Sequence, residues 1–228
     1  MFYEEIKMKK VILGVLVSLF IFYMPNFALA GDSGYYIGFK TGASIQDYSD
    51  VSFINPRITG TERDNDSETD AIYSFQVGKT LSNFPVRLEV EYASSGEVNF
   101  DRFHTPFPTT RQRIIVNSER VMFNMYHDRS FSYGSVYVGA GIGLAINNTD
   151  ALQGDSSEFK NKQVTSTAWS LGAGATKDIF KDYTLDLGYR YIDLGKADTG
   201  ESDFDAKDEQ FRGDLDAHEI IVGVRYNF

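Results

Sequence analysis

The last twelve residues of the chain, Ala217 to Phe228, read AHEIIVGVRYNF and alternate strictly between the two faces of a predicted β-strand. Apolar side chains occupy every second position and end in the aromatic pair Tyr226 and Phe228, whereas the other face carries Glu219 and Arg225. A free strand edge that ends in a large aromatic side chain promotes aggregation. We therefore expect this strand to close a barrel and to present its apolar face to lipid. The last strand of a soluble sandwich is the alternative.

The beginning of the chain has the parts of a secretory signal peptide. Three lysines precede an apolar run, and an Ala-Leu-Ala cleavage motif ends at Ala30. The unbroken apolar stretch, Val11–Met24, is shorter than the ~20 residues that a membrane-spanning helix needs. We predict a signal peptide at residues 1–30, followed by one domain at residues 31–228.

The composition agrees with an exported β protein. The 228 residues carry a net charge of −10 and include 14 Tyr, 18 Phe and 20 Gly, but no Cys. The acidic charge argues against nucleic acid as a partner. Without cysteine, an exported chain has to fold without disulfides. Many aromatic residues and glycines suit a chain of many strands and tight turns.

Eight alternating segments predict an all-β protein, an eight-stranded antiparallel up-and-down transmembrane barrel. Three of the connections are short turns and four are long and polar, which is typical of outer-membrane barrels. An even number of strands places both ends of the barrel on the periplasmic side. The predicted strands are residues 35–45, 71–79, 86–93, 115–127, 135–147, 165–177, 183–193 and 217–228.

The glycines on the polar faces indicate that these faces line the interior. A soluble lipocalin-like barrel also alternates, but with its apolar face inward. Gly141, Gly172 and Gly188 would weaken a solvated strand without any benefit. A narrow eight-stranded lumen needs such small residues beside large ones such as Tyr126 and Tyr137. We therefore predict that the polar faces enclose the lumen and that the apolar faces contact lipid.

This assignment of faces puts eight charged side chains in the lumen. Buried charges have to be paired, and four cations with four carboxylates can balance. We expect a static salt-bridge network that plugs the barrel, because eight strands leave no wide channel. A proton relay or a gated channel is the alternative. The eight residues are Lys40, Arg87, Glu89, Glu91, Asp186, Arg190, Glu219 and Arg225.

Four segments make residues 31–228 resemble the outer-membrane barrel family that includes the opacity proteins, the OmpA-type membrane domain and related surface antigens. The resemblance implies the cell outer membrane, with its lipid and lipopolysaccharide, as the location. It also implies that the barrel assembly machinery reads Val224, Tyr226 and Phe228 as an assembly signal. The segments are GYYIGFKTGAS (34–44), GSVYVGAGIGLA (134–145), LDLGYRYIDLG (185–195) and HEIIVGVRYNF (218–228).

The second long connection has the composition of a contact surface. Aromatic residues and arginines are the usual anchors of protein contacts. We expect this loop to meet a host-surface or extracellular-matrix protein; packing against the barrel rim or the lipid headgroups is the alternative. The residues are Phe100, Arg102, Phe103, Phe107 and Arg111.

The chain has no clear catalytic or metal-binding motif. His104, His127 and His218 lack a serine at a persuasive spacing for a Ser-His-acid triad. The acidic segment 198–209 could gather Ca²⁺, but its spacing is not that of an EF-hand, and a solvated loop is the preferred interpretation. We predict no catalytic residue, cofactor or metal, and a monomeric surface protein that acts as an adhesin or surface antigen. A small porin or a structural membrane protein is the alternative, and a lipid-modifying enzyme comes third.

Overall fold

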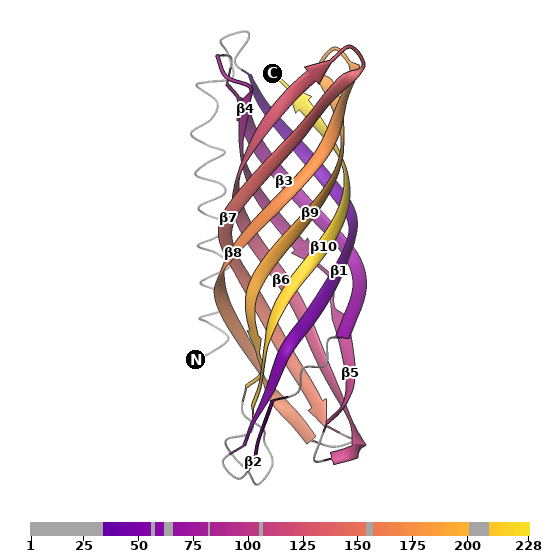
Figure 1. Cartoon of the computed structure of the whole chain (residues 1–228), viewed down its shortest axis with the longest axis vertical. Helices are drawn as coiled ribbons and strands as arrows, with labels where there is room; N and C mark the ends of the chain where they lie inside the picture. The colour runs from indigo at the N-terminus through magenta and orange to yellow at the C-terminus, as the bar shows by residue number, and fades with distance from the viewer. Residues whose placement is uncertain are drawn as a thin grey trace.

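The computed structural model shows one all-β antiparallel barrel (Figure 1). Among the described residues, no helix is long and apolar enough to cross a membrane. The predicted signal peptide lies outside the described part of the chain. The described residues are 34–55, 58–61, 66–81, 83–104, 107–153, 157–200 and 210–228. The strands are β1 (Tyr35–Asn55), β2 (Ile58–Thr61), β3 (Asp66–Thr80), β4 (Val86–Ser95), β5 (Val98–His104), β6 (Phe107–Phe131), β7 (Gly134–Gln153), β8 (Ser157–Phe180), β9 (Tyr183–Asp198) and β10 (Gln210–Asn227).

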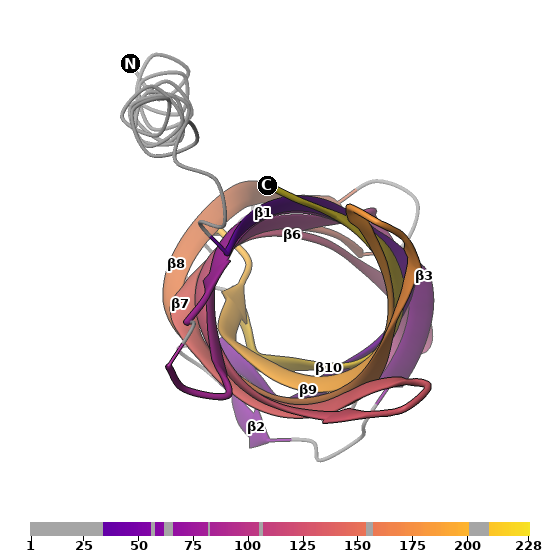
Figure 2. The same cartoon turned by 90° about the horizontal axis from the view of Figure 1, so that it is seen from above.

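Eight long strands form a closed ring, in the order β1-β3-β4-β6-β7-β8-β9-β10. Figure 2 shows this ring from above. The ring closes where β10 pairs with β1, from Tyr36 opposite Asn227 to Ile54 opposite Gln210. Because the ring closes, the C-terminal strand has no free edge, and the predicted eight-stranded barrel is confirmed. The two short strands extend the ring at one end, β2 along β1 and β5 along β6.

The strands are longer than predicted. β1 has 21 residues, β6 has 25 and β8 has 24, so much of each predicted long loop is paired strand instead. The three predicted short turns are present between β3 and β4, β6 and β7, and β8 and β9. They lie at the end where β1 begins and the chain ends, with Tyr35 bonded to Phe228, and we call this the near end (Figure 1). The opposite end is the far end.

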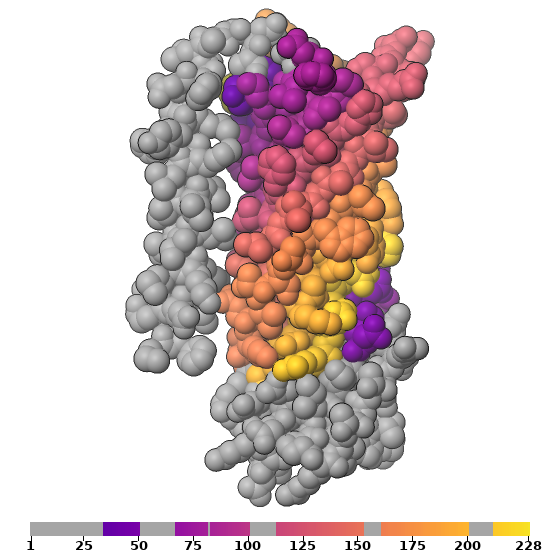
Figure 3. All heavy atoms as spheres, turned by 60° about the vertical axis from the view of Figure 1, so that its left-hand side comes forward, coloured from indigo at the N-terminus to yellow at the C-terminus, as the bar shows by residue number. Residues whose placement is uncertain are grey.

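An apolar band surrounds the outside of the barrel. Side chains with large exposed fractions include Phe39 (51%), Ile142 (59%), Leu187 (58%) and Ile220 (56%). These residues belong to the faces that were predicted to contact lipid, and the predicted inward residues are buried between them. In Figure 3 the strands run diagonally around this surface, and the hairpin between β6 and β7 projects beyond the near end.

Toward the far end, the band stops at a row of outward aspartates. Asp47, Asp216 and Asp193 lie side by side on β1, β10 and β9. We call the part of the barrel beyond this row the collar. Inside the collar, apolar side chains face inward and form a core. This core explains why paired strands continue past the apolar band.

Candidate functional site

Charged side chains of alternating sign form a single row along the lumen, which we call the charged file. Nearest to the near end, Arg87 donates from Nε to Asp128 at 3.1 Å. The Arg87 guanidinium also approaches Glu89, with 3.6 Å between Nη1 and Oε2. Lys40 Nζ lies 2.9 Å from Glu89 on the other side. Because Arg87, Glu89 and Lys40 are buried, each depends on the neighbouring charge for its solvation.

The file continues toward the far end through a second set of pairs. Arg190 donates both terminal nitrogens to Glu91, each at 2.9 Å, and approaches Glu219 at 2.7 Å. Arg120 Nη2 lies 2.5 Å from the other oxygen of Glu219. Lys40 links the two sets, with 3.8 Å between its Nζ and Glu91. Arg190 is therefore a two-sided clamp between buried carboxylates.

Tyrosines and an asparagine satisfy the remaining carboxylate oxygens. Tyr36 and Tyr126 donate to Glu89 at 2.9 and 3.2 Å, and Asn124 donates to Glu91 at 3.2 Å. Tyr126 packs edge-to-face against Tyr137, with 5.2 Å between ring centroids. A Cβ at Gly174 would overlap the Tyr137 hydroxyl, so the lumenal glycines make room for these rings.

Asp186 and Arg225 form a separate pair. Arg225 Nε lies 4.0 Å from Asp186, the limit of an ion pair. Tyr137 donates to Asp186 at 2.8 Å, and the Arg225 guanidinium lies 5.1 Å from the centre of the Tyr36 ring. Of the eight predicted lumenal charges, six thus belong to the file, and this pair joins it through tyrosines.

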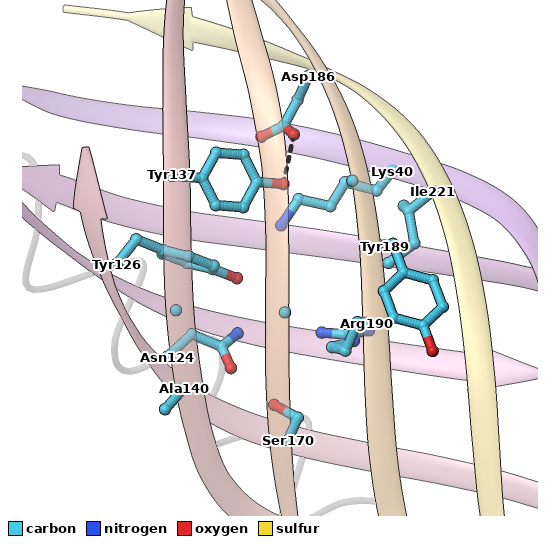
Figure 4. Close-up of a pocket in the computed structure, with 13 residues that line it drawn as sticks. Lys40, Asn124, Tyr126, Tyr137, Ala140, Ser170, Asp186, Tyr189, Arg190 and Ile221 are labelled. Carbon is cyan, nitrogen blue, oxygen red and sulfur yellow. Dashed lines mark hydrogen bonds between the residues drawn. The ribbon is translucent and has the colours of Figure 1, made fainter. Parts of the chain in front are cut away.

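The lumenal side chains leave little free space. Figure 4 shows Lys40, Tyr126, Tyr137 and Arg190 pointing into one small cavity. This cavity offers about 20 Å³ to the centre of a water molecule, and about 10–15 Å³ is needed to hold one. At this level of the barrel, the polar side chains therefore leave room for about one water molecule in this cavity.

The interior changes character in the collar, where a buried apolar cluster lies beside uncharged polar side chains such as Ser118 and Asn147. Tyr48 stacks on Phe100 with 5.5 Å between ring centroids, and its hydroxyl donates to the Ala197 carbonyl at 2.9 Å. The charged file therefore ends below the collar. The buried apolar cluster comprises Tyr48, Val98, Phe100, Ile114, Val116, Met122, Ala145, Ala151, Ala168, Ile192, Leu194, Ala197, Leu215 and Ala217.

The prediction that Phe100 is a loop contact is wrong. Its side chain is fully buried in the collar core, because even-numbered residues of β5 face inward, as the burial of Val98 also shows. The side chains of Arg102, Phe103, Phe107 and Arg111 lie outside the described part of the structure. Their contact role stays a prediction.

The rim above the apolar band holds a small group of possible metal ligands. One oxygen each of Asp47 and Asp216 and one ring nitrogen of His218 lie within 4.8 Å of one another. His218 Nδ1 is 2.6 Å from the Tyr189 hydroxyl. Partial burial, followed by the neighbouring Asp47 carboxylate, raises the pKa of Asp216. The acidic segment that was considered for Ca²⁺ lies mostly outside the described residues.

His218 and Glu219 do not form a catalytic pair. His218 faces outward, whereas the next residue, Glu219, faces the lumen and binds Arg120 and Arg190. Consecutive strand residues point to opposite sides, so the two cannot act on the same substrate. His127 faces outward near the end of β6, and the side chain of His104 is outside the described residues.

The fold and the outward apolar band define an outer-membrane β-barrel. The family model described as "Outer membrane protein beta-barrel domain" matches residues 14–228, and the chain belongs to this family. The predicted outer-membrane location is thereby confirmed. Among solved structures, the outer membrane protein OprG from Pseudomonas aeruginosa has a TM-score of 0.59 at 13% identity. It is matched over 86% of this chain and 96% of its own.

Two curated relatives are similar in sequence. Outer membrane protein PagN of Salmonella typhimurium is 28% identical over 159 residues, which are 63% of this chain and 66% of PagN. RP828 of Rickettsia prowazekii, named as a candidate adhesin, is 31% identical over 111 residues, 47% of this chain and 49% of the relative. The chain therefore matches between about half and two thirds of the length of these relatives.

Sequence reasoning missed two charges of the lumenal file. Arg120 lies on β6 with the same parity as Tyr126, which the sequence places in the lumen. Extending that parity by three more inward positions finds Arg120. Asp128 was assigned to a turn, but it lies in the last part of β6, where it meets Arg87.

Placing a cation in the apolar band tests the orientation of the wall. Leu187 is at the middle of the outward face of β9. Leu187→Arg should lower the free energy of unfolding by ~2–4 kcal/mol, as expected for a charge near the bilayer midplane. Urea unfolding of the barrel in lipid vesicles measures this loss. Leu187→Met is the matched control, and equal stability of the two variants would contradict a lipid-facing Leu187.

Proposed function

We propose that this protein is a non-enzymatic surface protein of the outer membrane, an adhesin or surface antigen, whose collar and far-end loops contact a host-surface or extracellular-matrix protein. The observation that carries the proposal is the collar: paired strands continue well beyond the apolar band and contain a core of their own. Such a rigid projection holds the far-end connections away from the membrane surface. The adhesin name of one relative supports the same role.

The interior supports this role over that of a porin. The charged file crosses the lumen within the apolar band, and the apolar core lies inside the collar. A pore would need a water-filled passage through both layers. In this proposal the outer surface of the protein, rather than its lumen, meets the partner.

The proposal includes the surroundings of the barrel. Lipid contacts the apolar band, and lipopolysaccharide surrounds the outer rim and the base of the collar. The barrel assembly machinery inserts the chain, which works as a monomer. The outward aromatic residues Tyr73 and Trp169, near the outer edge of the band, suit a position among headgroups.

Adhesion of bacteria tests the function. A non-adherent laboratory strain that displays the protein should bind cultured host cells or immobilised matrix proteins more than the same strain with an empty vector. A variant that carries short glycine-serine linkers in place of residues 56–65 and 201–209 provides the control, because it keeps the barrel but removes two far-end connections. Equal binding by all three strains would end the adhesin proposal.

A further inference from the structure

The collar wall has a seam between β3 and β5. The ladder between β3 and β4 ends with Ile72 opposite Ser95, and one last hydrogen bond runs from the Gly96 N–H to the Ala71 carbonyl at 3.4 Å. Beyond this point β3 continues to Asp66. Among the described strands, this part of β3 pairs only with β1, and β5 pairs only with β6. Two strand edges therefore lie along the seam without a ladder between them.

A carboxylate and a bulge end the ladder. From Ser94 to Val98 the chain advances four residues, whereas their partners on β6, Glu119 and Val116, are three residues apart. This extra residue is a β-bulge, which interrupts the ladder and increases the local twist. Asp70 accepts a hydrogen bond from the Ala71 N–H at 2.7 Å and so replaces the next rung.

Gly96 makes room for this arrangement. A Cβ at residue 96 would overlap Oδ2 of Asp70. That oxygen is buried and has no hydrogen-bond partner among the described residues. The base of the seam therefore holds an acceptor without a partner among the described residues, and the end of the ladder follows from the sequence at this point.

The β3 edge offers unpaired backbone groups to the outside. Backbone groups in an antiparallel strand point alternately to its two neighbours. Since the Ala71 carbonyl points toward the seam, the N–H and C=O groups of Thr69 and Ser67 point the same way. The side chains of Ser67, Glu68 and Thr69 are exposed. Tyr73, near the outer edge of the apolar band, lies on the membrane side of this edge, so the edge is outside the membrane.

The charge along the seam selects the kind of strand that could pair there. Glu68 and Glu97 are exposed, and Asp70 lies beside Gly96 at the base of the seam. Residues 66–78 and 93–101 contain no lysine or arginine. A second copy of the chain would bring the same carboxylates to the contact, and like charges on paired strands are destabilising. A cationic strand would instead be attracted to this edge.

We propose that the seam binds an extended, cationic polypeptide segment by addition of a strand to the β3 edge. Backbone hydrogen bonds to Ser67 and Thr69 supply the pairing. Lysine or arginine side chains of the segment meet Glu68, Asp70 and Glu97. This partner class rests on the proposed adhesive function, because it names the chemistry of the molecule to which the collar would attach.

Peptide binding to the purified full barrel in detergent micelles tests the proposal. The probe is a short peptide of alternating lysine and valine, and its Kd is compared with that of the same peptide N-methylated along one edge. N-methylation should weaken binding by about tenfold, because it removes donors from the added strand. Thr69→Pro should also weaken binding by about tenfold. Its nitrogen faces the seam, so proline removes no bond to β1.

Three comparisons keep the proposal falsifiable. Thr69→Val keeps the backbone donor and should bind like the unmodified protein, and heat-modifiable gel migration checks that both variants fold. Equal affinity for the N-methylated peptide would overturn strand addition. Equal affinity for a peptide of alternating glutamate and valine would overturn the charge argument. Dimerisation that competes with the peptide would show that a second copy occupies the edge instead.

The adhesion assay separates this inference from the proposed function. Suppose that displayed wild-type protein adheres, and that Thr69→Pro adheres and binds the peptide as well as the wild type does. The proposed peptide site at the seam is then overturned, and the proposed adhesive function remains. If the peptide binds with the expected dependence on Thr69 but displayed protein does not adhere, the seam stands and the proposed function fails.

Discussion

Arg190→Ala should lower the free energy of unfolding of the barrel by about 3–5 kcal/mol, the usual loss when one partner of a buried ion pair is removed. Arg190 lies 2.9 Å from both oxygens of Glu91 and 2.7 Å from Glu219. The substitution leaves these two carboxylates facing each other in a poorly hydrated lumen. Reversible urea unfolding of the lipid-refolded barrel, followed by tryptophan fluorescence, measures the loss.

Two variants serve as controls for this measurement. Arg212 pairs with Asp198 at 3.6 Å on the exposed collar, so Arg212→Ala should cost less than about 1 kcal/mol. Arg190→Lys keeps the charge but cannot bind Glu91 through two parallel hydrogen bonds, so its loss should lie between the other two. Equal losses for Arg190→Ala and Arg212→Ala would mean that the lumenal file does not stabilise the barrel.

The second large effect concerns assembly. Phe228→Asp should abolish accumulation in the outer membrane while export to the periplasm continues. The Phe228 N–H donates to the Tyr35 carbonyl at 2.9 Å, so this residue lies at the junction that closes the ring. Its ring packs edge-to-face on Tyr226, with 5.1 Å between centroids. Aspartate removes that aromatic contact and places a carboxylate at the edge of the apolar band.

Membrane fractionation and heat-modifiable gel migration measure this assembly. Phe228→Tyr is the matched control, because it keeps an aromatic ring with a polar tip that suits an interfacial position, and it should accumulate normally. Normal outer-membrane levels of Phe228→Asp would show that the last residue is not read as an assembly signal.

The number of strands and the faces of the wall could be predicted from the sequence because both depend on local alternation. The strand ends could not, and β6 shows the physical reason. Within the apolar band, β6 presents Phe123 outward and Asn124 inward, whereas in the collar it presents Asn117 outward and Ile114 inward. The contrast between the faces reverses within one strand. A search for outward apolar residues therefore stops where the collar begins.

The inward orientation of the lumenal charges could also be predicted from the local sequence, but the partner of each charge could not. Parity alone puts Arg87 and Arg190 inside, yet it cannot tell that one meets Asp128 and the other clamps Glu91 against Glu219. Those contacts depend on the register between β4, β6, β9 and β10. The prediction for Phe100 was wrong for a different reason. The composition of its segment indicated a contact loop, whereas Phe100 lies on the inward face of a strand and is buried in the collar core.

The apolar core of the collar has a consequence for how this protein can change over generations. Because side chains such as Tyr48, Phe100 and Leu215 pack together inside the collar, the collar is held by residues of its own strands. Substitutions in the far-end connections leave these packing contacts in place. A lineage under pressure from antibodies can therefore alter what it displays while the wall beneath keeps its fold.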